Sequence, residues 1–194
     1  MSGRRWTRAD YDLDAATLAE RLLGARLVHR TASGKRVSGI IVETEAYLGA
    51  PDLASHAVGG RRTKRNEVMY AGAGRAYVYF IYGMHHCFNV VCGGEHEAHA
   101  VLVRALRPDE GVELMRRRRG AEVAERLLCA GPGRLCRAMG IDLRQNGADM
   151  VGARGLFVED ASTAGEVRAV RTARIGVGYA GAWASKPLRW VVAG

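Results

Sequence analysis

The spacing of apolar side chains in the first third of the chain predicts one helix followed by a β-hairpin. Leu18 and Leu22 recur at helical spacing within residues 11–24, and a glycine at the end of that segment can cap the helix. Residues 26–31 and 36–43 alternate or run apolar on either side of a short Ala-Ser-Gly segment. Two such runs joined by a glycine-containing turn are typical of a hairpin.

Apolar strands and glycine-rich turns continue through the rest of the chain. Residues 75–82 and 87–92 predict a second hairpin with Gly83 near its tip. Residues 48–66 are glycine-rich and basic without periodicity, which predicts a long functional loop. The next predicted elements are a strand over 101–106, a helix over 108–118 that begins at Pro108, and helices over 121–129 and 134–139. An exposed connection over 141–155 and short strands over 156–159 and 167–170 follow, and the tail ends in the apolar residues 190–192. This pattern favours one mixed α/β (α+β) domain, residues 1–194, with a largely antiparallel sheet.

The overall charge indicates an anionic partner. The 194 residues carry a formal net charge of +9, with a pI of about 9.9. A field of that sign favours nucleic acid or acidic lipid, although a basic protein with scattered surface charge has the same composition. No apolar run approaches the roughly 18 residues of a membrane span, and the N-terminus lacks the apolar core of a signal peptide. We therefore expect no membrane partner and a cytoplasmic protein, nucleoid-associated in a bacterium.

The cysteine pattern does not indicate a metal site. Cys87, Cys92, Cys129 and Cys136 include no Cys-x-x-Cys pair, and no histidines complete a zinc-site spacing. The signature of the zinc deaminases is also absent. We interpret all four as reduced thiols, mostly small core residues, and expect no metal.

Candidate chemistry begins at the end of an apolar strand. Glu45 follows the apolar residues 40–42, so burial would desolvate it and favour a role as a base, although a glutamate there is also commonly a solvated carboxylate. Glu43 shares its face if the strand continues. Tyr47 and His56 flank the carboxylate with flat rings and polar tips that suit a nucleobase, while the alternative for His56 is an ordinary loop histidine.

The second hairpin offers further aromatic and polar groups. Tyr77 and Tyr79 share one face of their strand, where tyrosine pairs usually pack in the core. Tyr82 sits beside the turn glycine and, with Met84, could wedge between base pairs. Asn89 in an apolar strand either reads a purine edge from a pocket or hydrogen-bonds to the backbone.

Arginines supply the candidate electrostatic contacts. Arg104 lies in an apolar run and needs an anionic partner, with Glu45 as one candidate. We expect Arg134 to contact phosphate. The run Arg116–Arg119 lies at a predicted helix end, where the helix dipole explains part of the charge, so it is a weaker indication of DNA binding. The long loop holds a basic and polar cluster suited to clamping a phosphate, namely Arg61, Arg62, Thr63, Lys64, Arg65 and Asn66.

A set of motifs extends over nearly the whole chain, from about Leu18 to the end. They are Val42-Glu-Thr-Glu-Ala-Tyr-Leu-Gly49, Ala54-Ser-His56 leading to Gly59-Gly-Arg61, Arg65-Asn66, Tyr77-Val-Tyr-Phe-Ile-Tyr-Gly-Met84, Asn89, Leu102-Val-Arg-Ala-Leu106, Gly131-Pro132, Arg174-Ile-Gly-Val-Gly-Tyr-Ala-Gly181 and Lys186-Pro-Leu-Arg189. Together they resemble the alkyladenine DNA glycosylase family, also called the methylpurine or 3-methyladenine DNA glycosylases of the animal and bacterial type.

The resemblance implies a monofunctional glycosylase that flips a damaged purine from double-stranded DNA and hydrolyses its N-glycosidic bond in base-excision repair. It also implies an enzyme without metal or organic cofactor, built on a curved sheet with flanking helices and a protruding hairpin. We expect a monomer, because the substrate is asymmetric and a single pocket suffices. The roles it implies are water activation by Glu45, water binding by Arg104 and a backbone carbonyl at Ile175, a base pocket of Tyr47, Ala54, His56, Tyr79 and Asn89, intercalation by Tyr82 and Met84, and phosphate contacts by Arg61, Thr63, Arg65 and Arg134.

One residue departs from the family pattern, and alternative functions remain open. His85 stands where an aromatic residue is common, which alters the contacts of the hairpin tip. A non-catalytic damaged-DNA-binding protein on the same scaffold is the first alternative, and the presence of Glu45 and Arg104 argues against it. A formyltransferase-like enzyme would need a formyl-donor site, and a nuclease would need clustered carboxylates for two metals; the sequence shows neither.

Overall fold

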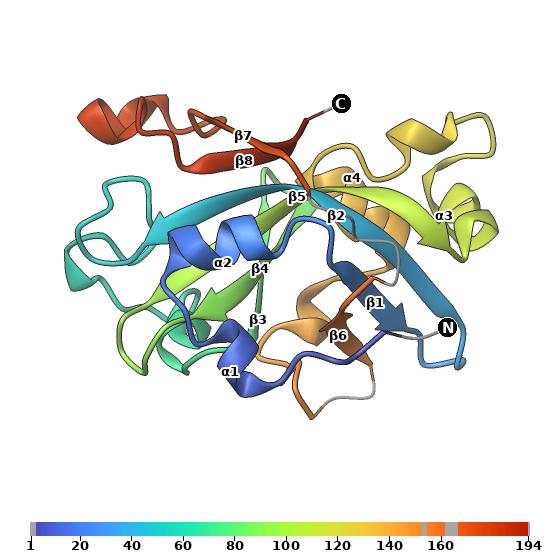
Figure 1. Ribbon diagram of the computed structural model, residues 1–194, viewed down its shortest axis with the longest axis horizontal. Coiled ribbons are helices and arrows are strands. Elements are labelled where there is room, and N and C mark those ends of the chain that lie inside the picture. Colours follow the sequence, from blue (N-terminus) through green and yellow to red (C-terminus); the bar gives the residue numbers. More distant parts are fainter. Residues whose placement is uncertain (1–2, 153–154, 162–166, 194) are drawn as a thin grey trace.

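The structure is a computed structural model that describes residues 3–152, 155–161 and 167–193 (Figure 1). Its centre is a sheet in which all described strand pairs are antiparallel. The main path of the sheet runs in the order β3 (Ala76–Ile81), β4 (His85–Cys92), β5 (His99–Glu110), β2 (Arg36–Leu48), β1 (Arg26–Arg30) and β6 (Leu156–Glu159). Two more strands pair with each other, β7 (Ala169–Thr172) and β8 (Arg189–Val192), and β8 also pairs with β2. The predicted mixed fold with a largely antiparallel sheet is confirmed.

Strand β2 organises the sheet because it changes partner along its length. Its first residues pair with β1 and Glu43–Glu45 pair with β8, while β5 follows its other edge. The pairing with β5 shifts register after Ser38 and again between Ile41 and Glu43. Such irregularities bend a strand and increase its twist. The end of β2 therefore leaves the first hairpin and runs beside β8.

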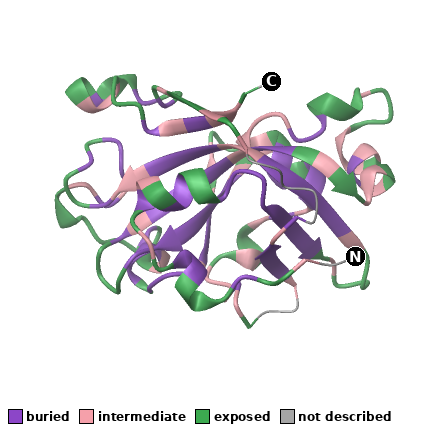
Figure 2. Cartoon of the chain, in the orientation of Figure 1, coloured by how far each residue is buried: buried purple, intermediate pink, exposed green. Residues whose placement is uncertain are grey.

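Helices cover the sheet and complete the core. The α-helices of the described chain are α1 (Arg8–Tyr11), α2 (Ala15–Arg21), α3 (Val112–Arg119) and α4 (Pro132–Met139). Helix α2 packs against β2, and α4 packs against β4 and β5. Helix α4 begins at Pro132, whose fixed φ suits a first turn, and follows Gly131 with a φ of 121°. The buried residues concentrate on the strands and on the inner sides of these helices (Figure 2).

The contact between α2 and β2 decides which face of β2 is free to form a site. The hydroxyl of Thr44 donates to the carbonyl of Ala19 in α2 at 2.7 Å. Side chains alternate between the two faces of a strand. Glu43, Glu45 and Tyr47 therefore point to the face opposite α2.

The predicted helix start at Pro108 is wrong. Strand β5 continues to Glu110 and carries Pro108 opposite Gly39 of β2. Helix α3 begins only after Gly111, where a φ of 71° and the close carbonyl of Arg36 exclude a Cβ. Pairing along the edge of β2 therefore overrides the local preference of proline for a first helical turn.

The other differences concern the ends of predicted elements. Residues 121–129 form only a short 3-10 turn, Glu125–Leu127, and the predicted helix over 11–24 is divided by Asp14, which caps α2. Strand β7 begins at Ala169, two residues later than predicted. Both hairpins, the strand after them, α4 and β6 are confirmed, and the apolar tail residues 190–192 lie in β8. Residues 153 and 154 of the predicted connection lie outside the described residues.

The described helices are short. The longest α-helices, α3 and α4, have eight residues each. Across residues 3–152, 155–161 and 167–193, none is long and apolar enough to cross a bilayer.

The packing of α4 predicts a large stability loss when its buried face is truncated. We expect Leu135→Ala to lower the free energy of unfolding by about 2–5 kcal/mol, because Leu135 is fully buried and its removal leaves a cavity. Urea denaturation followed by circular dichroism measures the change. The matched control is Leu143→Ala, since Leu143 is half-exposed and its truncation should cost no more than about 0.5 kcal/mol. Equal losses in the two variants would contradict the packing of α4.

Candidate functional site

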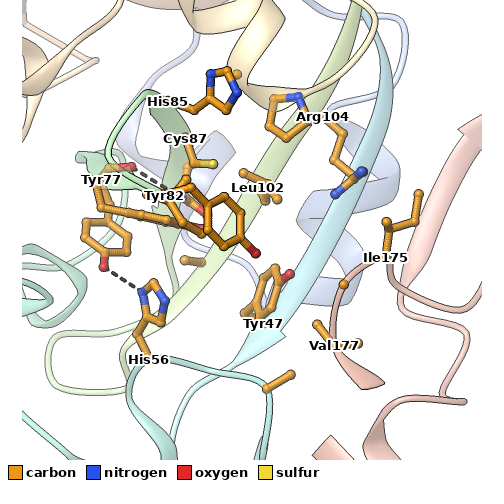
Figure 3. A pocket seen from close by; sticks show the side chains of 18 of the residues that line it. Tyr47, His56, Tyr77, Tyr82, His85, Cys87, Leu102, Arg104, Ile175 and Val177 are labelled. Carbon is orange, nitrogen blue, oxygen red and sulfur yellow. Dashed lines mark hydrogen bonds between the residues drawn. The ribbon is translucent and has the colours of Figure 1, made fainter. Parts of the chain in front are cut away.

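A cavity of about 340 Å³ opens on the free face of the sheet, beside β2, β4 and β5 (Figure 3). This volume lies within the range of small-ligand pockets. The cavity is lined by most of the predicted site residues, namely Tyr47, Ala54, His56, Tyr79, Tyr82, Asn89, Arg104 and Ile175. Glu45 lies directly behind this lining, because its carboxylate contacts three of these residues.

The carboxylate of Glu45 is fully buried and held by three hydrogen-bond donors. Its Oε1 accepts the backbone N–H of Ile175 at 2.7 Å. Its Oε2 accepts the hydroxyl of Tyr47 at 3.0 Å and a guanidinium N–H of Arg104 at 3.3 Å. An ionised carboxylate offers about four lone-pair positions, so one acceptor position is left beyond these three bonds. The arrangement can therefore bind and orient one further donor, such as a water molecule.

Arg104 is shared between the two glutamates of β2. Its Nε donates to Glu43 at 2.8 Å, and its other edge reaches Glu45. Burial lowers the pKa of Arg104, but the carboxylates of Glu45 and Glu43 outweigh burial and leave that pKa above its ordinary value. Arg189 in β8 also donates to Glu43, at 2.7 Å. The predicted pairing of Arg104 with Glu45 is confirmed, and Glu43 fixes the orientation of the guanidinium group.

A buried ion pair joins the loop after β2 to the segment that contains Ile175. Arg174 and Asp52 form two parallel hydrogen bonds of 2.6 and 2.9 Å, and both side chains are fully buried. Arg174 also donates to the carbonyl of Ala46 at 2.9 Å. Asp52 accepts the backbone N–H groups of Leu48 and Ala54. Bidentate pairs of this kind fix geometry as well as charge.

Tyr47 connects this ion pair to Glu45. The guanidinium group of Arg174 lies 4.7 Å from the centre of the Tyr47 ring, within the range of a cation–π contact. Burial raises the pKa of Tyr47, and the Glu45 carboxylate raises it further. The phenol therefore stays protonated at neutral pH and remains a donor to Glu45.

Three aromatic residues form the wall that faces Tyr47 across the cavity. The ring nitrogen Nδ1 of His56 hydrogen-bonds to the hydroxyl of Tyr77 at 2.8 Å, and the His56 ring meets Tyr79 edge-on with centroids 4.7 Å apart. Burial, together with the nearby Arg65 and Arg61, lowers the pKa of His56 to about 4. His56 is therefore neutral at neutral pH and fixed by its tyrosine partner, which excludes the ordinary solvated loop histidine. Tyr77 was expected in the core, and it both packs there and lines the cavity.

Two smaller residues complete the floor and rim. Asn89 is buried, and its side-chain amide donates to the carbonyl of Tyr77 at 3.1 Å. The sequence offered two alternatives for Asn89, a hydrogen bond to the backbone or a place in a pocket. The structure shows both, because Asn89 also lines the cavity. The carbonyl of Ala54 accepts the hydroxyl of Tyr179 at 3.4 Å, on the rim next to Ile175.

The tip of the hairpin β3–β4 presents exposed apolar groups. Tyr82 is 82% exposed and Met84 is 69% exposed. Tyr82 has a φ of 54°, a left-handed conformation that is uncommon outside glycine and costs about 1–3 kcal/mol. His85 lies two residues after Gly83 and packs closely on Gly133. A Cβ on Gly133 would lie 2.9 Å from the His85 ring. The hairpin is therefore held against the start of α4.

The predicted phosphate-binding loop is ordered by a buried side chain. Asn66 accepts the N–H and hydroxyl of Thr63 and donates to the carbonyls of His56 and Arg61. Asn66 is 1% exposed, so its expected place in the phosphate clamp is wrong and its role is to shape the loop. The side chains of Arg61, Thr63 and Lys64 are exposed, as is that of Arg65, which lies over Tyr79.

The arginines outside the cavity differ in whether their side chains already have partners within the protein. In the run Arg116–Arg119, three members donate to backbone carbonyls of the following segment or of α4. Arg62 in the loop is paired with Glu67. Arg134 is exposed and donates to the carbonyl of Ala130 at 3.3 Å. The low weight given to Arg116–Arg119 as DNA contacts has a structural reason for Arg116, which pairs with Glu113 and Glu125, but not for Arg119, whose bond to the carbonyl of Leu128 leaves its charge unneutralised.

The sequence did not single out the Arg174–Asp52 pair, although both residues position the site. Asp52 follows a proline in the long loop, which marks a turn but not a buried ion pair. Arg174 lies in a family-like motif beside Ile175, and only the fold brings it to Asp52. The four cysteines are free and buried, as predicted. In the described part of the chain, no group of three or more metal-ligating side chains is suited to hold a metal ion.

Comparison with known proteins gives a consistent result. The family model described as methylpurine-DNA glycosylase (MPG) matches residues 9–194. The mouse DNA-3-methyladenine glycosylase is 43% identical, over 95% of this chain and 58% of the mouse protein. Proteins of Desulfitobacterium hafniense and Chlamydia pneumoniae, both provisionally named 3-methyladenine DNA glycosylase, are 44% and 45% identical over 91% and 92% of this chain and 89% and 90% of their own lengths.

The buried ion pair predicts a large effect when one partner loses its charge. We expect Asp52→Asn to lower the free energy of unfolding by about 3–5 kcal/mol, because it leaves the Arg174 charge buried without its partner. Urea denaturation measures the loss. The control is Glu67→Gln, whose ion pair with Arg62 is about half exposed and contributes about 0–1 kcal/mol. A loss as small as that of the control would show that Asp52 does not hold Arg174 in solution.

The low pKa of His56 predicts a pH dependence of stability. Between about pH 6.5 and pH 4 the unfolded chain binds a proton at His56 that the folded chain does not, so His56 lowers stability as the pH falls through this window. We expect His56→Gln to flatten the dependence there, as measured by urea denaturation at a series of pH values. The exposed His96 provides the comparison, through His96→Gln. A steep wild-type slope that survives in His56→Gln would contradict the prediction.

Proposed function

The chain belongs to the methylpurine-DNA glycosylase family, and we propose that it is a monofunctional 3-methyladenine DNA glycosylase of base-excision repair. It flips an alkylated or deaminated purine out of duplex DNA and hydrolyses the N-glycosidic bond. The observation that carries this proposal is the buried Glu45 carboxylate behind an aromatic cavity, with three fixed donors and one acceptor position left. We expect the protein to act as a monomer, because the substrate is asymmetric and a single pocket suffices.

The cavity suits a purine that has left the base stack. Tyr47 on one side and the His56–Tyr79 pair on the other offer flat surfaces for a base between them. Alkylation at N3 or N7 gives a purine a positive charge, which strengthens stacking on electron-rich tyrosine rings. Ala54 leaves space on the rim, and Asn89 occupies the floor where the amino group of normal guanine would clash. These contacts favour damaged purines over normal ones.

The chemistry assigned to Glu45 is removal of a proton from water. The water oxygen attacks C1′ of the sugar, its proton passes to Glu45, and the C1′–N bond breaks with its electrons leaving on the base. Arg104 and the backbone carbonyl of Ile175 are proposed to hold the water, while the Ile175 N–H fixes the carboxylate. An alkylated purine leaves as a neutral base. His56 is neutral at neutral pH, so it can donate a hydrogen bond to a leaving base but does not carry an excess proton.

The exposed hairpin tip supplies the proposed contact with the duplex. Tyr82 and Met84 enter the space that the flipped nucleotide leaves, which offsets part of the few kcal/mol that flipping costs. Tyr82 keeps its strained φ at the hairpin tip, where its ring is exposed at the mouth of the cavity. Arg61, Thr63, Arg65 and Arg134 contact backbone phosphates around the pocket.

The decisive experiment compares base release by wild type and Glu45→Gln. Duplexes with a single hypoxanthine, ethenoadenine or alkylated purine are incubated in EDTA and then treated with alkali to cut abasic sites. We expect cleavage only after alkali, and a loss of at least about 100-fold in single-turnover rate for Glu45→Gln, because glutamine cannot accept the proton. Binding to the damaged duplex should remain.

The control variant is Glu67→Gln, which changes an exposed glutamate outside the site. It should release base at the wild-type rate. Release by Glu45→Gln at the rate of this control would overturn the mechanism. No release by wild type from any lesion, with tight duplex binding, would show a damage-binding protein instead of an enzyme.

A further inference from the structure

Three arginines form a patch on α3 and α4 that we call the α3–α4 arginine patch, made of Arg119, Arg134 and Arg137. Arg134 and Arg137 are exposed and lie three residues apart, so they are neighbours on one side of α4. The other side of the helix is buried, with Leu135 and Cys136 in the core. Arg119 ends α3, which packs against α4.

The guanidinium groups of the patch are oriented without being neutralised. The Nε of Arg119 donates to the carbonyl of Leu128 at 3.0 Å, and the Nε of Arg137 donates to the carbonyl of Arg118 at 2.7 Å. Within the described part of the chain, no member of the patch forms an ion pair, whereas Arg116 pairs with acidic side chains. The outer N–H groups of Arg119 and Arg137 are therefore pre-oriented and available to an anion, which lowers the entropy cost of binding.

The patch is electrostatically unfavourable for the protein alone. Burial lowers the pKa of Arg119, and repulsion from Arg134 and Arg137 lowers it further. Arg134 also lies in the first turn of α4, where the helix dipole disfavours a cation. An anion that contacts all three side chains would relieve both costs.

The patch is continuous with the proposed base pocket. Pro132 and Gly133, which precede Arg134 in α4, line the cavity, and Gly133 supports His85. In Figure 3, His85 and His56 lie at opposite ends of the cavity. The loop with residues 61–65 follows His56 and lies at the His56 end of the cavity. The α3–α4 arginine patch lies beyond the other end, next to His85.

We propose that the α3–α4 arginine patch binds the phosphate backbone of duplex DNA beyond the pocket, with Arg119 and Arg137 extending the contact expected for Arg134. The inference rests on the proposed function, since it takes DNA as the partner. Each strand of a duplex carries one charge per about 3.4 Å of helix axis, so a run of three guanidinium groups meets a run of phosphates. The patch adds affinity without base specificity, because phosphates carry no sequence information.

The test is the salt dependence of binding to an undamaged duplex, measured by fluorescence anisotropy. Each lost phosphate contact reduces the slope of log K against log salt concentration by about 0.9. We expect a reduction of about 0.9 for Arg137→Ala and about 1.8 for Arg119→Ala/Arg137→Ala, and binding roughly tenfold weaker per contact near 0.1 M salt. The matched control is Arg30→Ala, at the exposed end of β1, which should keep the wild-type slope.

Lysine variants separate charge from structure. Arg119→Lys/Arg137→Lys keeps both charges but loses the Nε–carbonyl bonds, so we expect a slope near that of wild type. A slope for the double alanine variant equal to that of Arg30→Ala would overturn the proposal, as would an equal loss in the lysine variant. Binding to undamaged DNA does not require base release. If wild type releases no base but the double alanine variant still shows the reduced salt slope, the proposal for this surface holds and only the proposed glycosylase activity is overturned.

Discussion

The buried ion pair between Arg174 and Asp52 holds together the two chain segments on which the pocket depends. Burying two charges costs several kcal/mol per ion, and only excellent geometry compensates for it. The pair meets this condition with two short bonds, and further bonds to Ala46, Leu48 and Ala54 satisfy its remaining atoms, with Nε of Arg174 as the exception. One residue after Arg174, the backbone N–H of Ile175 reaches Glu45. The carboxylate is therefore positioned by a contact between segments more than 120 residues apart.

Strand β2 imposes the second constraint, which is the face of the sheet that each side chain occupies. Its pleat and its change of partner place the glutamates on the face opposite α2. Thr44 faces α2, so Glu43 and Glu45 share the opposite face and divide Arg104 between them. Each glutamate also has a donor of its own, Arg189 for Glu43 and Tyr47 for Glu45. This arrangement lets a buried carboxylate remain an acceptor. Because β2 continues to Leu48, Glu45 lies inside the strand and not at its end, and the strand encloses it between its partners.

Local patterns in the sequence predicted the parts of the molecule that depend on neighbouring residues. The two hairpins, α4 after Gly131, and Glu45 at the end of an apolar run follow from periodicity and turn chemistry. Pro108 was misassigned because pairing with β2, distant in sequence, outweighs its local preference. The roles of Asp52 and Asn66 could not be predicted, since each depends on contacts that exist only after the chain folds. Motif resemblance supplied residue identities in the site, and the structure adds how they are held.

The arginines of this chain show that residue type alone does not identify a functional charge. Arg116 and Arg118 donate to carbonyls or pair with acids, so their charge stabilises the fold. Arg134 and Arg137 stand beside each other with no acidic partner among residues 3–152, 155–161 and 167–193, and Arg134 opposes the dipole of its own helix. Tyr82 likewise keeps a strained φ at an exposed tip. Stable folding does not account for the position of Arg134 or the φ of Tyr82, and the bond of Arg137 to the carbonyl of Arg118 orients its charge without neutralising it. The proposed contact with DNA would account for these placements, because a bound polyanion would offset the cost that each residue imposes on the free chain.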